Sequence, residues 1–461
     1  MNLSGPSAVQ SPVSPEVEAG IFRVGTLRYN KQGLVILFFW LMWNDFSLMF
    51  LEQVGSLTGF LMKDLGANYT ELGTIGTIGS IVGLWINPVF SVWSDRHRGA
   101  WGRRRPFLFV ATPIMAFFLV ITPYMPDFYH YLMTVPWAAW ILNRIPMSGP
   151  ILFIALAGFI MGLFNAIVLT LFSYLYWDVV PEPVLGRFTA LSKVAAALAS
   201  FVWLYYFFGY GEHHLKGVYL GVSLFCLVVY LISVWQIKEG EYPPPDVHSK
   251  GGLFAPIRSY FVECYSKPFF LWIFVGFTLI QIGNLGNDYR NFYLHYDLHL
   301  NLDEIGKASA APLPIIVILG FVVGSLADRL KPVRLMPPLT LVWAMTNVGA
   351  YWFVHDQWSY IVWFTLINLA IFAQGVLYGA LIPELYPREK LGQFCSACAT
   401  MITAILSAGR VFVGVFFDHI HNTRFCFLWS AIFQVLAALV FVKVYTNWRK
   451  RGGHVPVPHG G

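Results

Sequence analysis

The stretch SDRHRGAWGRRRPF, residues 94–107, separates two apolar segments and contains five arginines within ten residues. An arginine left at the centre of a bilayer is costly, so this stretch must be a loop in water or among headgroups that joins two membrane helices. Cytoplasmic loops of membrane proteins carry an excess of lysine and arginine. We therefore expect this loop on the cytoplasmic side of a membrane.

The composition indicates that the rest of the chain lies in a membrane as well. Of 461 residues, 57% are hydrophobic and 12% are charged, whereas about 25% of the residues of soluble domains are charged. The 17 tryptophans fit aromatic belts at both membrane interfaces. The net charge of +6 does not indicate a nucleic-acid partner, because the basic residues cluster in short loops beside apolar segments.

Apolar segments long enough to cross a bilayer, which takes about 20 residues in a helix, recur along the chain. The predicted spans are residues 34–62, 70–93, 106–123, 151–177, 188–209, 216–236, 269–295, 305–327, 335–355, 358–381, 393–416 and 424–446. The sequence thus predicts an all-α polytopic membrane protein with twelve transmembrane helices. We expect the outer stretch 124–150 to hold a short interfacial helix.

The basic residues orient the predicted helices. With the amino terminus inside, most of the 30 lysines and arginines fall in cytoplasmic segments, and the opposite orientation would reverse this bias. The exceptions are Lys63, Arg144, Lys216, Lys307 and Arg424 outside, and Lys193, Arg290 and Arg410 within spans. We expect an integral protein of the plasma (inner) membrane with both termini cytoplasmic.

An internal repeat divides the chain into two halves. Asp328-Arg329 follows the eighth span as Asp95-Arg96 follows the second. Such repeats build alternating-access transporters, which hold the substrate between two bundles near the middle of the membrane. We predict two pseudo-symmetric six-helix bundles. The predicted segments are a cytoplasmic N-terminal segment 1–33, a first bundle 34–236, a cytoplasmic linker 237–268 with an interfacial helix, a second bundle 269–446 and a cytoplasmic tail 447–461.

Two carboxylates in the first span are candidates for proton coupling. Asp45 and Glu52 are seven residues apart, and this spacing places both side chains on nearly the same face of a helix. An intramembrane acid is a functional candidate by default. The alternative is that each acid is tied permanently into an ion pair or a helix-end hydrogen bond.

Polar side chains recur along the seventh predicted span at spacings that favour one helical face. Hydrogen-bonding groups in a row suit a polyhydroxylated ligand, because an amide both donates and accepts. The competing interpretation is interhelical hydrogen bonding. The row consists of Gln281, Asn284, Asp288 and Asn291. The substrate-binding candidates are Gln281, Asn284 and Asn291 of this row and Asn287 beside it, with Trp43, Asn44 and Asn165 from the first half.

Arg290 and Arg410 need acidic partners inside the membrane. Charge balance alone offers Asp45, Glu52 and Asp288, so we hypothesise that these five ionisable groups couple a proton to a conformational change. Lys193 lies near the start of the fifth span, and we expect its side chain to reach the inner interface.

The pattern of residues 94–107 resembles the loop after the second helix of sucrose/proton symporters. These belong, with their glycoside-pentoside-hexuronide relatives, to the major facilitator superfamily, and the similarity is strongest from about Leu57 to Phe107. The resemblance implies the major facilitator fold, a monomer, proton-driven glycoside uptake and a matching role for Glu52. Plant sucrose carriers place an Asp in the fourth span, where this chain has Asn165. Melibiose-type permeases use acids in the second span for sodium, and none lies between Gly73 and Trp93 here, so sodium is disfavoured.

The resemblance also implies a cytoplasmic gate. An anion such as Asp95 at the end of one helix can meet the positive amino-terminal end of another, and the loop arginines can pair with nearby acids. The predicted gate residues are Asp95, Arg96, Gly102, Arg103, Arg104, Arg105, Asp178 and Glu182, with Asp328 and Arg329 as the weaker counterpart in the second half.

Other classes of protein find little support in the sequence. It contains no zinc-protease motif, nucleophile elbow or phosphate loop, so we expect neither an enzyme nor a metal site, and no cofactor besides the coupling proton. A channel is disfavoured by the duplicated halves. The remaining alternative is a sodium-coupled or facilitative carrier, or an exporter, of another small solute on the same fold.

Overall fold

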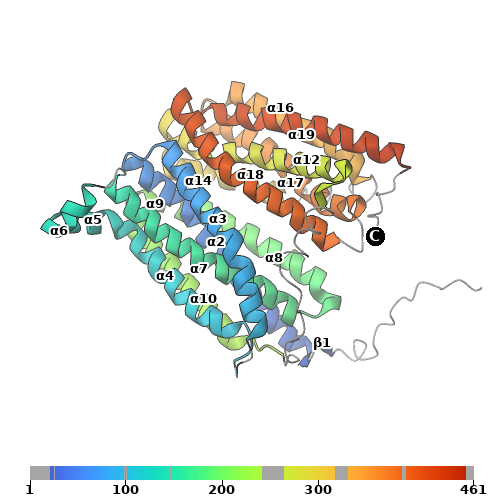
Figure 1. Ribbon diagram of the computed structural model, residues 1–461, viewed down its shortest axis with the longest axis horizontal. Coiled ribbons are helices and arrows are strands. Elements are labelled where there is room, and N and C mark those ends of the chain that lie inside the picture. The colour runs from blue at the N-terminus through green and yellow to red at the C-terminus, as the bar shows by residue number, and fades with distance from the viewer. Residues whose placement is uncertain are drawn as a thin grey trace, which may run out of the picture.

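The computed structural model describes residues 21–24, 26–97, 99, 101–144, 148–240, 264–316, 331–386 and 391–452. These ranges are almost wholly helical, apart from a small antiparallel hairpin of β1 (Phe22–Val24) and β2 (Leu27–Tyr29). Figure 1 shows the helices gathered into two bundles, one from each half of the chain. The predicted all-helical architecture is therefore confirmed.

The first bundle contains long helices at the predicted spans, joined by shorter ones. Its long helices are α2 (Lys31–Asp64), α3 (Tyr69–Arg96), α4 (Arg105–Ile121), α7 (Gly149–Val179), α8 (Glu182–Val202) and α10 (Leu215–Gln236). Its short segments are η1 (Thr122–Tyr124), α5 (Met125–Met133), α6 (Pro136–Leu142), η2 (Trp203–Phe207) and α9 (Tyr210–His213). The outer stretch 124–150 thus carries two short helices, α5 and α6, where one was expected.

The second bundle is built in the same way. Its described helices are α12 (Pro268–Leu285), α13 (Arg290–Phe292), α14 (Leu302–Ala310), α16 (Pro332–Phe353), α17 (Gln357–Leu385), α18 (Leu391–Ile420) and α19 (Phe425–Lys450). Most of the eighth predicted span and of the interfacial linker helix lies outside the described residues.

Within the described ranges, nine helices are long and apolar enough to cross a membrane. Helices α3 and α16 also lie at predicted spans but are not among these nine.

Polar residues fix where the helices begin. Asn68 and Glu71 form a capping box at the start of α3, in which the Asn68 side chain accepts from the Glu71 backbone N–H at 2.7 Å. Asp356 caps α17 by accepting from the Ser359 N–H at 2.7 Å, which holds the pKa of this carboxyl below its ordinary value.

The seventh predicted span is not a regular helix. After α12 ends, residues Gly286–Tyr289 form the 3₁₀ segment η3, and beyond α13 the residues Tyr293–Asp297 form the π segment η4. Gly286 packs so closely on α19 that an added Cβ would lie 2.8 Å from the Cys426 carbonyl oxygen. A 3₁₀ turn rotates successive side chains differently from an α turn. The segment therefore departs from the regular α-helix on which the predicted polar face was based.

The two bundles meet along α3 and α18. A Cβ at Gly73 would lie 2.3 Å from the Arg410 carbonyl oxygen, and a Cβ at Gly414 would lie 2.4 Å from that of Tyr69. The hydroxyl of Thr77 also donates to the Ser407 carbonyl at 2.6 Å. Small residues thus let the two backbones touch, as expected for membrane helices.

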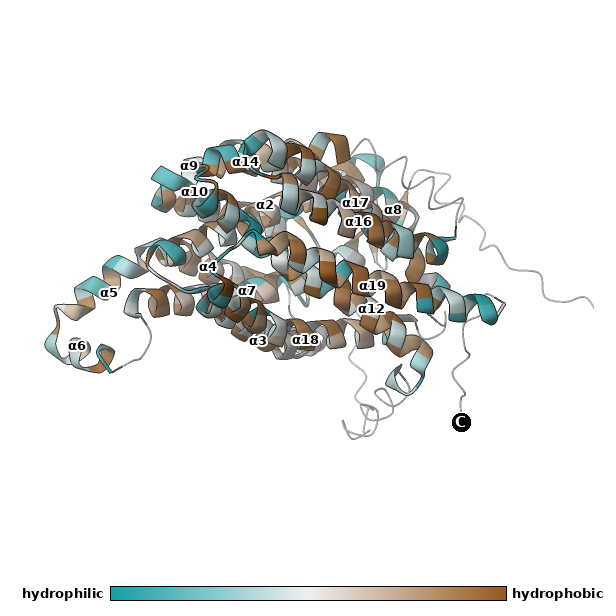
Figure 2. Ribbon diagram, turned by 90° about the horizontal axis from the view of Figure 1, so that it is seen from above, coloured by the Kyte–Doolittle hydropathy of each residue, from teal (hydrophilic) through white to brown (hydrophobic). Residues whose placement is uncertain are grey.

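The bundles converge at one end and diverge at the other. Figures 1 and 2 show α9 of the first bundle near α14 of the second at the convergent end, while in Figure 1 α8 and β1 lie toward the divergent end. Figure 2 shows hydrophobic colour along the helices and hydrophilic colour mainly near their ends, as on α9 and at the end of α19. The two bundles therefore pack together at one end and lie apart at the other.

Candidate transport site and gates

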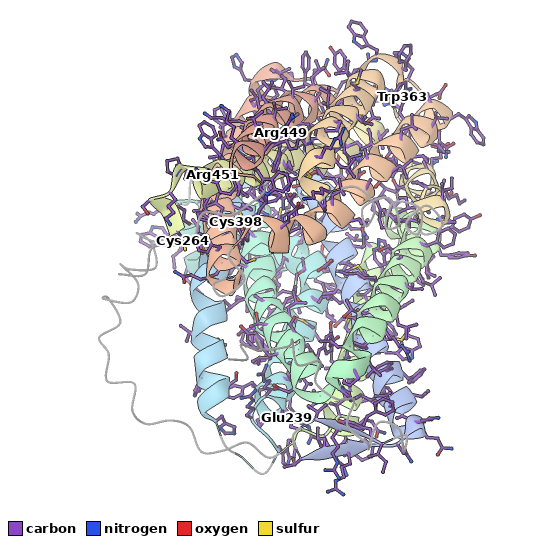
Figure 3. The ribbon with its side chains drawn as sticks, turned by 90° about the vertical axis from the view of Figure 1, so that its right-hand side faces the viewer. Glu239, Cys264, Trp363, Cys398, Arg449 and Arg451 are labelled. Atoms are coloured by element: carbon purple, nitrogen blue, oxygen red, sulfur yellow. The ribbon has the colours of Figure 1, made fainter. Side chains whose placement is uncertain are left out.

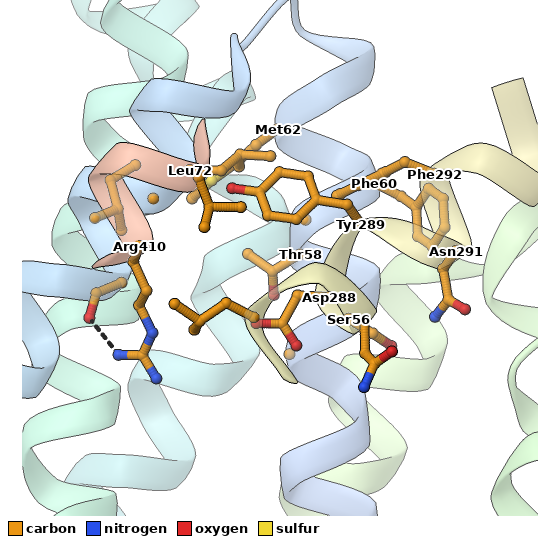
Figure 4. Close-up of a pocket in the computed structure, with 18 of the residues that line it drawn as sticks. Ser56, Thr58, Phe60, Met62, Leu72, Asp288, Tyr289, Asn291, Phe292 and Arg410 are labelled. Carbon is orange, nitrogen blue, oxygen red and sulfur yellow. Dashed lines mark hydrogen bonds between the residues drawn. The ribbon is translucent and has the colours of Figure 1, made fainter. Parts of the chain in front are cut away.

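A cavity of about 590 Å³ lies between the two bundles. Helices α2 and α3 form one wall, and η3, α13 and α18 form the other. Its polar and charged lining residues are Ser56, Thr58, Asn287, Asp288, Arg290, Asn291 and Arg410. In the view of Figure 4, Asp288 of η3 lies between Thr58 and Ser56 of α2, and Arg410 of α18 enters the same region from the side. Both halves of the chain therefore contribute to one site.

Asp288 faces two arginines in this cavity. Arg410 and Arg290 both act on it electrostatically. The Arg410 guanidinium donates to the Gly76 carbonyl oxygen at 3.2 Å and to the hydroxyl of Ser80, so it is held by α3 of the opposite bundle. The Arg290 guanidinium lies over the Phe364 ring at 4.2 Å. The site thus brings Asp288, Arg290 and Arg410 together with an excess of positive charge.

Asp45 is held inside the first bundle. Its carboxylate accepts hydrogen bonds from the Tyr176 hydroxyl on α7, at 3.1 Å, and from the Ser192 hydroxyl on α8. Both partners belong to the first bundle, as does Asp45 itself.

Glu52 lies in a more open environment on the same helix. Its side chain is exposed, and it sits one turn from Gly55 and Ser56, which line the central cavity. Lys193 acts electrostatically on both Glu52 and Asp45. The cation that faces these two acids is therefore a lysine of α8 and neither of the predicted arginines.

The expected placement of Lys193 at the inner interface needs correction. Helix α8 begins at Glu182, earlier than the predicted span, so Lys193 lies about three turns into the helix. Its neighbour Ser192 donates to Asp45. Lys193 is thus positioned beside the acids of α2.

The polar row of the seventh span divides between two cavities. Asn287 and Asn291 line the central cavity, whereas Gln281 and Asn284 line another of about 300 Å³ inside the second bundle. An amide ladder connects them, because Asn287 Nδ2 donates to Asn284 Oδ1 at 3.1 Å and Asn284 Nδ2 donates to Gln281 Oε1 at 2.8 Å.

Three other candidates lie away from the central cavity. Trp43 lines an apolar pocket and packs edge-on against Phe225 with 5.8 Å between ring centroids. Asn44 is 1% exposed, and its amide has no partner among the described residues. Asn165 has a buried carbonyl oxygen that likewise has none. The structure does not bring these side chains to the polar lining.

The arginine loop is tied to Asp178 at the end of α7. Arg103 Nη2 donates to both oxygens of Asp178 at 2.9 Å, and Arg104 Nε lies 2.8 Å from the same carboxylate. Arg105 Nε donates to the Val234 carbonyl at 2.6 Å. The arginines therefore connect α4 to α7 and α10 within the first bundle.

Glu239 is a partner of this loop that sequence reasoning missed. Its carboxylate accepts from the backbone N–H groups of Arg103, Arg104 and Arg105 at 2.9 to 3.0 Å, and so caps α4. Gly102 has φ of +94°, and an added Cβ would lie 2.8 Å from the Glu239 carboxyl carbon. Figure 3, which views the divergent end, shows Glu239 far from Arg449 and Arg451 of the other bundle.

Part of the predicted gate cannot be placed. The side chains of Asp95, Arg96 and Glu182 are not described, although Asp95 and Arg96 end α3 and Glu182 begins α8. Asp328 and Arg329 lie outside the described residues.

At the convergent end, helix termini of one bundle meet acids of the other. Asp418, near the end of α18, accepts from the backbone N–H groups of Tyr69 and Thr70 at 2.8 and 2.7 Å. Asp64 accepts from the Tyr296 hydroxyl at 2.7 Å, and Glu212 accepts from the Leu302 N–H at 2.8 Å. Asp418 falls just beyond the predicted eleventh span. The position of Asp418 near the end of a predicted helix could have marked it as a candidate.

Comparison with known proteins supports the interpretation of the fold. A family model described as Major Facilitator Superfamily matches residues 289–458. No curated protein matches the sequence. These residues cover most of the second bundle, including α18 and its Arg410.

Solved structures match nearly the whole chain. One is a bacterial homologue of the human lysosomal transporter Spinster, inward-facing and unoccupied, with 13% identity, TM-score 0.65, and coverage of 90% of this chain and 97% of that one. Another is the nucleoside transporter NupG, with 12% identity, TM-score 0.61, and coverage of 89% of this chain and 99% of that one. A third is the E. coli xylose transporter XylE in an inward-open conformation, with 13% identity, TM-score 0.58, and coverage of 89% of this chain and 95% of that one.

The predicted fold class is confirmed by these likenesses, which show that the chain has the major facilitator fold. The comparisons do not single out the sucrose symporters among proteins of this fold.

Proposed function

We propose that this chain, which has the fold of major facilitator transporters, carries out proton-coupled symport of a sugar, a sucrose-like disaccharide or another glycoside, by alternating access. The observation that supports this most is the central cavity, in which hydroxyl and amide side chains from both bundles lie beside ionisable groups. A site between the halves is where such carriers hold their substrate.

The cavity suits a hydroxylated solute in size and chemistry. Its volume of about 590 Å³ falls within the range of roughly 300–1,000 Å³ found for small-molecule sites. Ser56, Thr58 and Asn291 offer groups that both donate and accept hydrogen bonds, as sugar hydroxyls require. Tyr289 and Phe292 add aromatic surface for the C–H face of a ring.

Glu52 is the proposed proton carrier. Its side chain is exposed one turn from the cavity residues Gly55 and Ser56, whereas Asp45 is already held by two hydroxyl groups. When Glu52 takes up a proton, its attraction to Lys193 disappears, and the first bundle loses a charge from a surface that must be desolvated for the inner end to close. Release of the proton to the inner side restores that charge and favours the open state.

The remaining elements of the proposal concern topology. The predicted orientation places both termini in the cytoplasm of a cell with the protein in its plasma (inner) membrane, as a monomer. Labelling of a cysteine introduced at Lys450, at the end of α19, by an impermeant reagent tests this. Labelling only after the cells are opened supports the orientation, and labelling of intact cells contradicts it.

Uptake of radiolabelled sucrose into proteoliposomes tests the function. We expect accumulation when the outside is more acidic than the inside, and only equilibration without a pH gradient. Stimulation by a sodium gradient instead would favour the sodium-coupled alternative. Absence of both uptake and counterflow with every disaccharide tried would exclude sugar symport.

One observation favours a second candidate, the transport of a small anionic solute. The central cavity contains Arg290 and Arg410 against the single described acid Asp288. An uncompensated arginine is a natural partner for a carboxylate or phosphate group. Inhibition of sucrose uptake by a hydroxylated acid such as glucuronate, with faster uptake of the acid itself, would favour this candidate.

A further inference from the structure

The first bundle carries an apolar groove of about 410 Å³ between α2, the end of α8 with η2, and α10. None of its described lining residues is charged, in contrast to the central cavity with its acid and two arginines. The aromatic lining residues are Trp43, Phe46 and Phe50 of α2, Phe207 of η2, Tyr210 of α9 and Phe225 of α10. The groove therefore suits a hydrocarbon ligand.

Two glycines of α10 keep the groove open. Gly217 and Gly221 line it and are exposed, and nothing lies within 4 Å of a Cβ added at either position. The groove reaches inward to Phe50, which is 7% exposed, and to the buried residues Val218 and Val222. The bundle thus has a recess here that its own side chains do not fill.

The groove faces the bilayer. Its walls belong to three of the helical segments that are long and apolar enough to cross a membrane, Lys31–Asp64, Pro183–Phe207 and Leu215–Gln236. On α10 the exposed residues Leu220 and Leu224 continue the face that carries the two glycines. Helix α10 packs mainly on α2 and α4, and none of its described residues lines the central cavity. Lipid is therefore what meets this face of the protein.

The length of the groove matches one leaflet of a bilayer. At 1.5 Å per residue, Gly217 to Phe225 cover about 12 Å along α10, and Trp43 to Phe50 cover about 10 Å along α2. The hydrocarbon of one leaflet is about 15 Å thick, which is half of a bilayer core. The groove begins next to the exposed Lys216 in the first turn of α10. A lipid headgroup at the level of Lys216 would thus place its acyl chain along the groove.

We propose that this groove binds one acyl chain of a membrane phospholipid, from the leaflet at the end where α9 approaches α14. An empty recess deprives the atoms around it of dispersion contacts, and a chain that fills it supplies them. The aromatic rings contribute large apolar surfaces to these contacts. The inference does not depend on which solute the protein transports.

The bound chain also supports a contact between the two bundles. Phe207 and Tyr210 line the groove, and Gly209 lies between them in the sequence. Gly209 packs on α14 so closely that an added Cβ would lie 2.5 Å from the Cα of Asp303. The chain therefore packs on one side of a segment whose other contacts are with the second bundle.

Titration of the delipidated protein with dioleoyl phosphatidylcholine in detergent, followed by native mass spectrometry, tests the proposal. Gly221→Leu places a side chain in the groove. Gly158→Leu on α7 is the matched control, because nothing lies within 4 Å of an added Cβ there and Gly158 does not line the groove. Loss of about ten carbon–carbon contacts corresponds to a roughly tenfold loss of affinity for the first bound lipid. We expect this loss in Gly221→Leu and wild-type affinity in Gly158→Leu.

The other possible results contradict the proposal. Equal affinity for the first lipid in the three proteins overturns it, as does a wild type that retains no lipid. A wild-type dimer that Gly221→Leu alone converts to a monomer would show that a second copy of the chain covers the groove instead. Should Gly221→Leu fail to fold, Gly217→Leu replaces it with the same expected loss of affinity, because a Cβ at Gly217 is equally unobstructed.

Discussion

At the scale of single residues, the environment of an acid distinguishes its possible roles better than its position in the sequence. Asp45 and Glu52 share a face of α2, yet Asp45 accepts two hydrogen bonds and Glu52 is exposed. Lys193 acts electrostatically on both acids. Their spacing could not predict that Tyr176 and Ser192, distant in sequence, would hold only one of them.

Glu52→Gln tests the proposed proton carrier. Because glutamine cannot take up or release a proton at this position, we expect sucrose accumulation driven by a pH gradient to be lost while counterflow between equal sugar pools persists. Transport assays in proteoliposomes separate the two activities. Asp303→Asn is the control, since Asp303 forms an exposed pair with Lys307 at 2.6 Å on α14. Accumulation by Glu52→Gln at the wild-type level would remove this residue from the mechanism.

The cavity residues show where prediction from the sequence stops. Gln281, Asn284, Asp288 and Asn291 were expected on one helical face, but the 3₁₀ segment η3 divides them. No proline marks this change of helix type, and at Gly286 the segment packs closely on α19. Such a tertiary contact leaves no periodic pattern in the sequence.

At the scale of elements, α3 and α18 form the principal contact between the bundles. The loops and spans around them were predictable from the lengths of the apolar segments and the positions of the charged residues, because placing a charge in lipid is costly. Which helices touch across the bundles could not be predicted, because the sequence does not show which glycines face the other bundle.

Gly73→Ala tests the importance of this contact. An added Cβ would lie 2.3 Å from the Arg410 carbonyl oxygen, and such overpacking typically costs about 1–3 kcal/mol. We expect a lower melting temperature or a shift away from the conformation closed at the convergent end. Gly79→Ala is the matched control, because nothing lies within 4 Å of a Cβ there. Equal effects of the two substitutions would contradict the close approach.

Asp418→Asn tests the acid that caps α3 from the opposite bundle. The carboxylate accepts two backbone hydrogen bonds and one from the Thr70 hydroxyl at 2.6 Å. Loss of its charge is expected to cost about 1 kcal/mol, and to shift the equilibrium toward opening at the convergent end. Alkylation of Ser56→Cys by an impermeant reagent from that side should become faster. An unchanged rate would show that this cap does not hold the end closed.

At the scale of the whole molecule, the two bundles share one cavity and are closed around it at a single end. Residues from both bundles line the cavity, while the acids Asp64, Glu212 and Asp418 join helices across the convergent end. The duplicated halves were visible in the sequence. The conformation was not, because the alternating states of a carrier have the same sequence and similar energies.

The most direct test of the account is a pair of distances between spin labels. One pair, at Thr189 on α8 and Ser396 on α18, reports on the divergent end, and the other, at the exposed residues Lys216 and Lys307, reports on the convergent end. With sucrose at acidic pH we predict that the first distance shortens while the second lengthens. Distances that stay fixed, or that change in the same direction, would contradict alternating access around the central cavity.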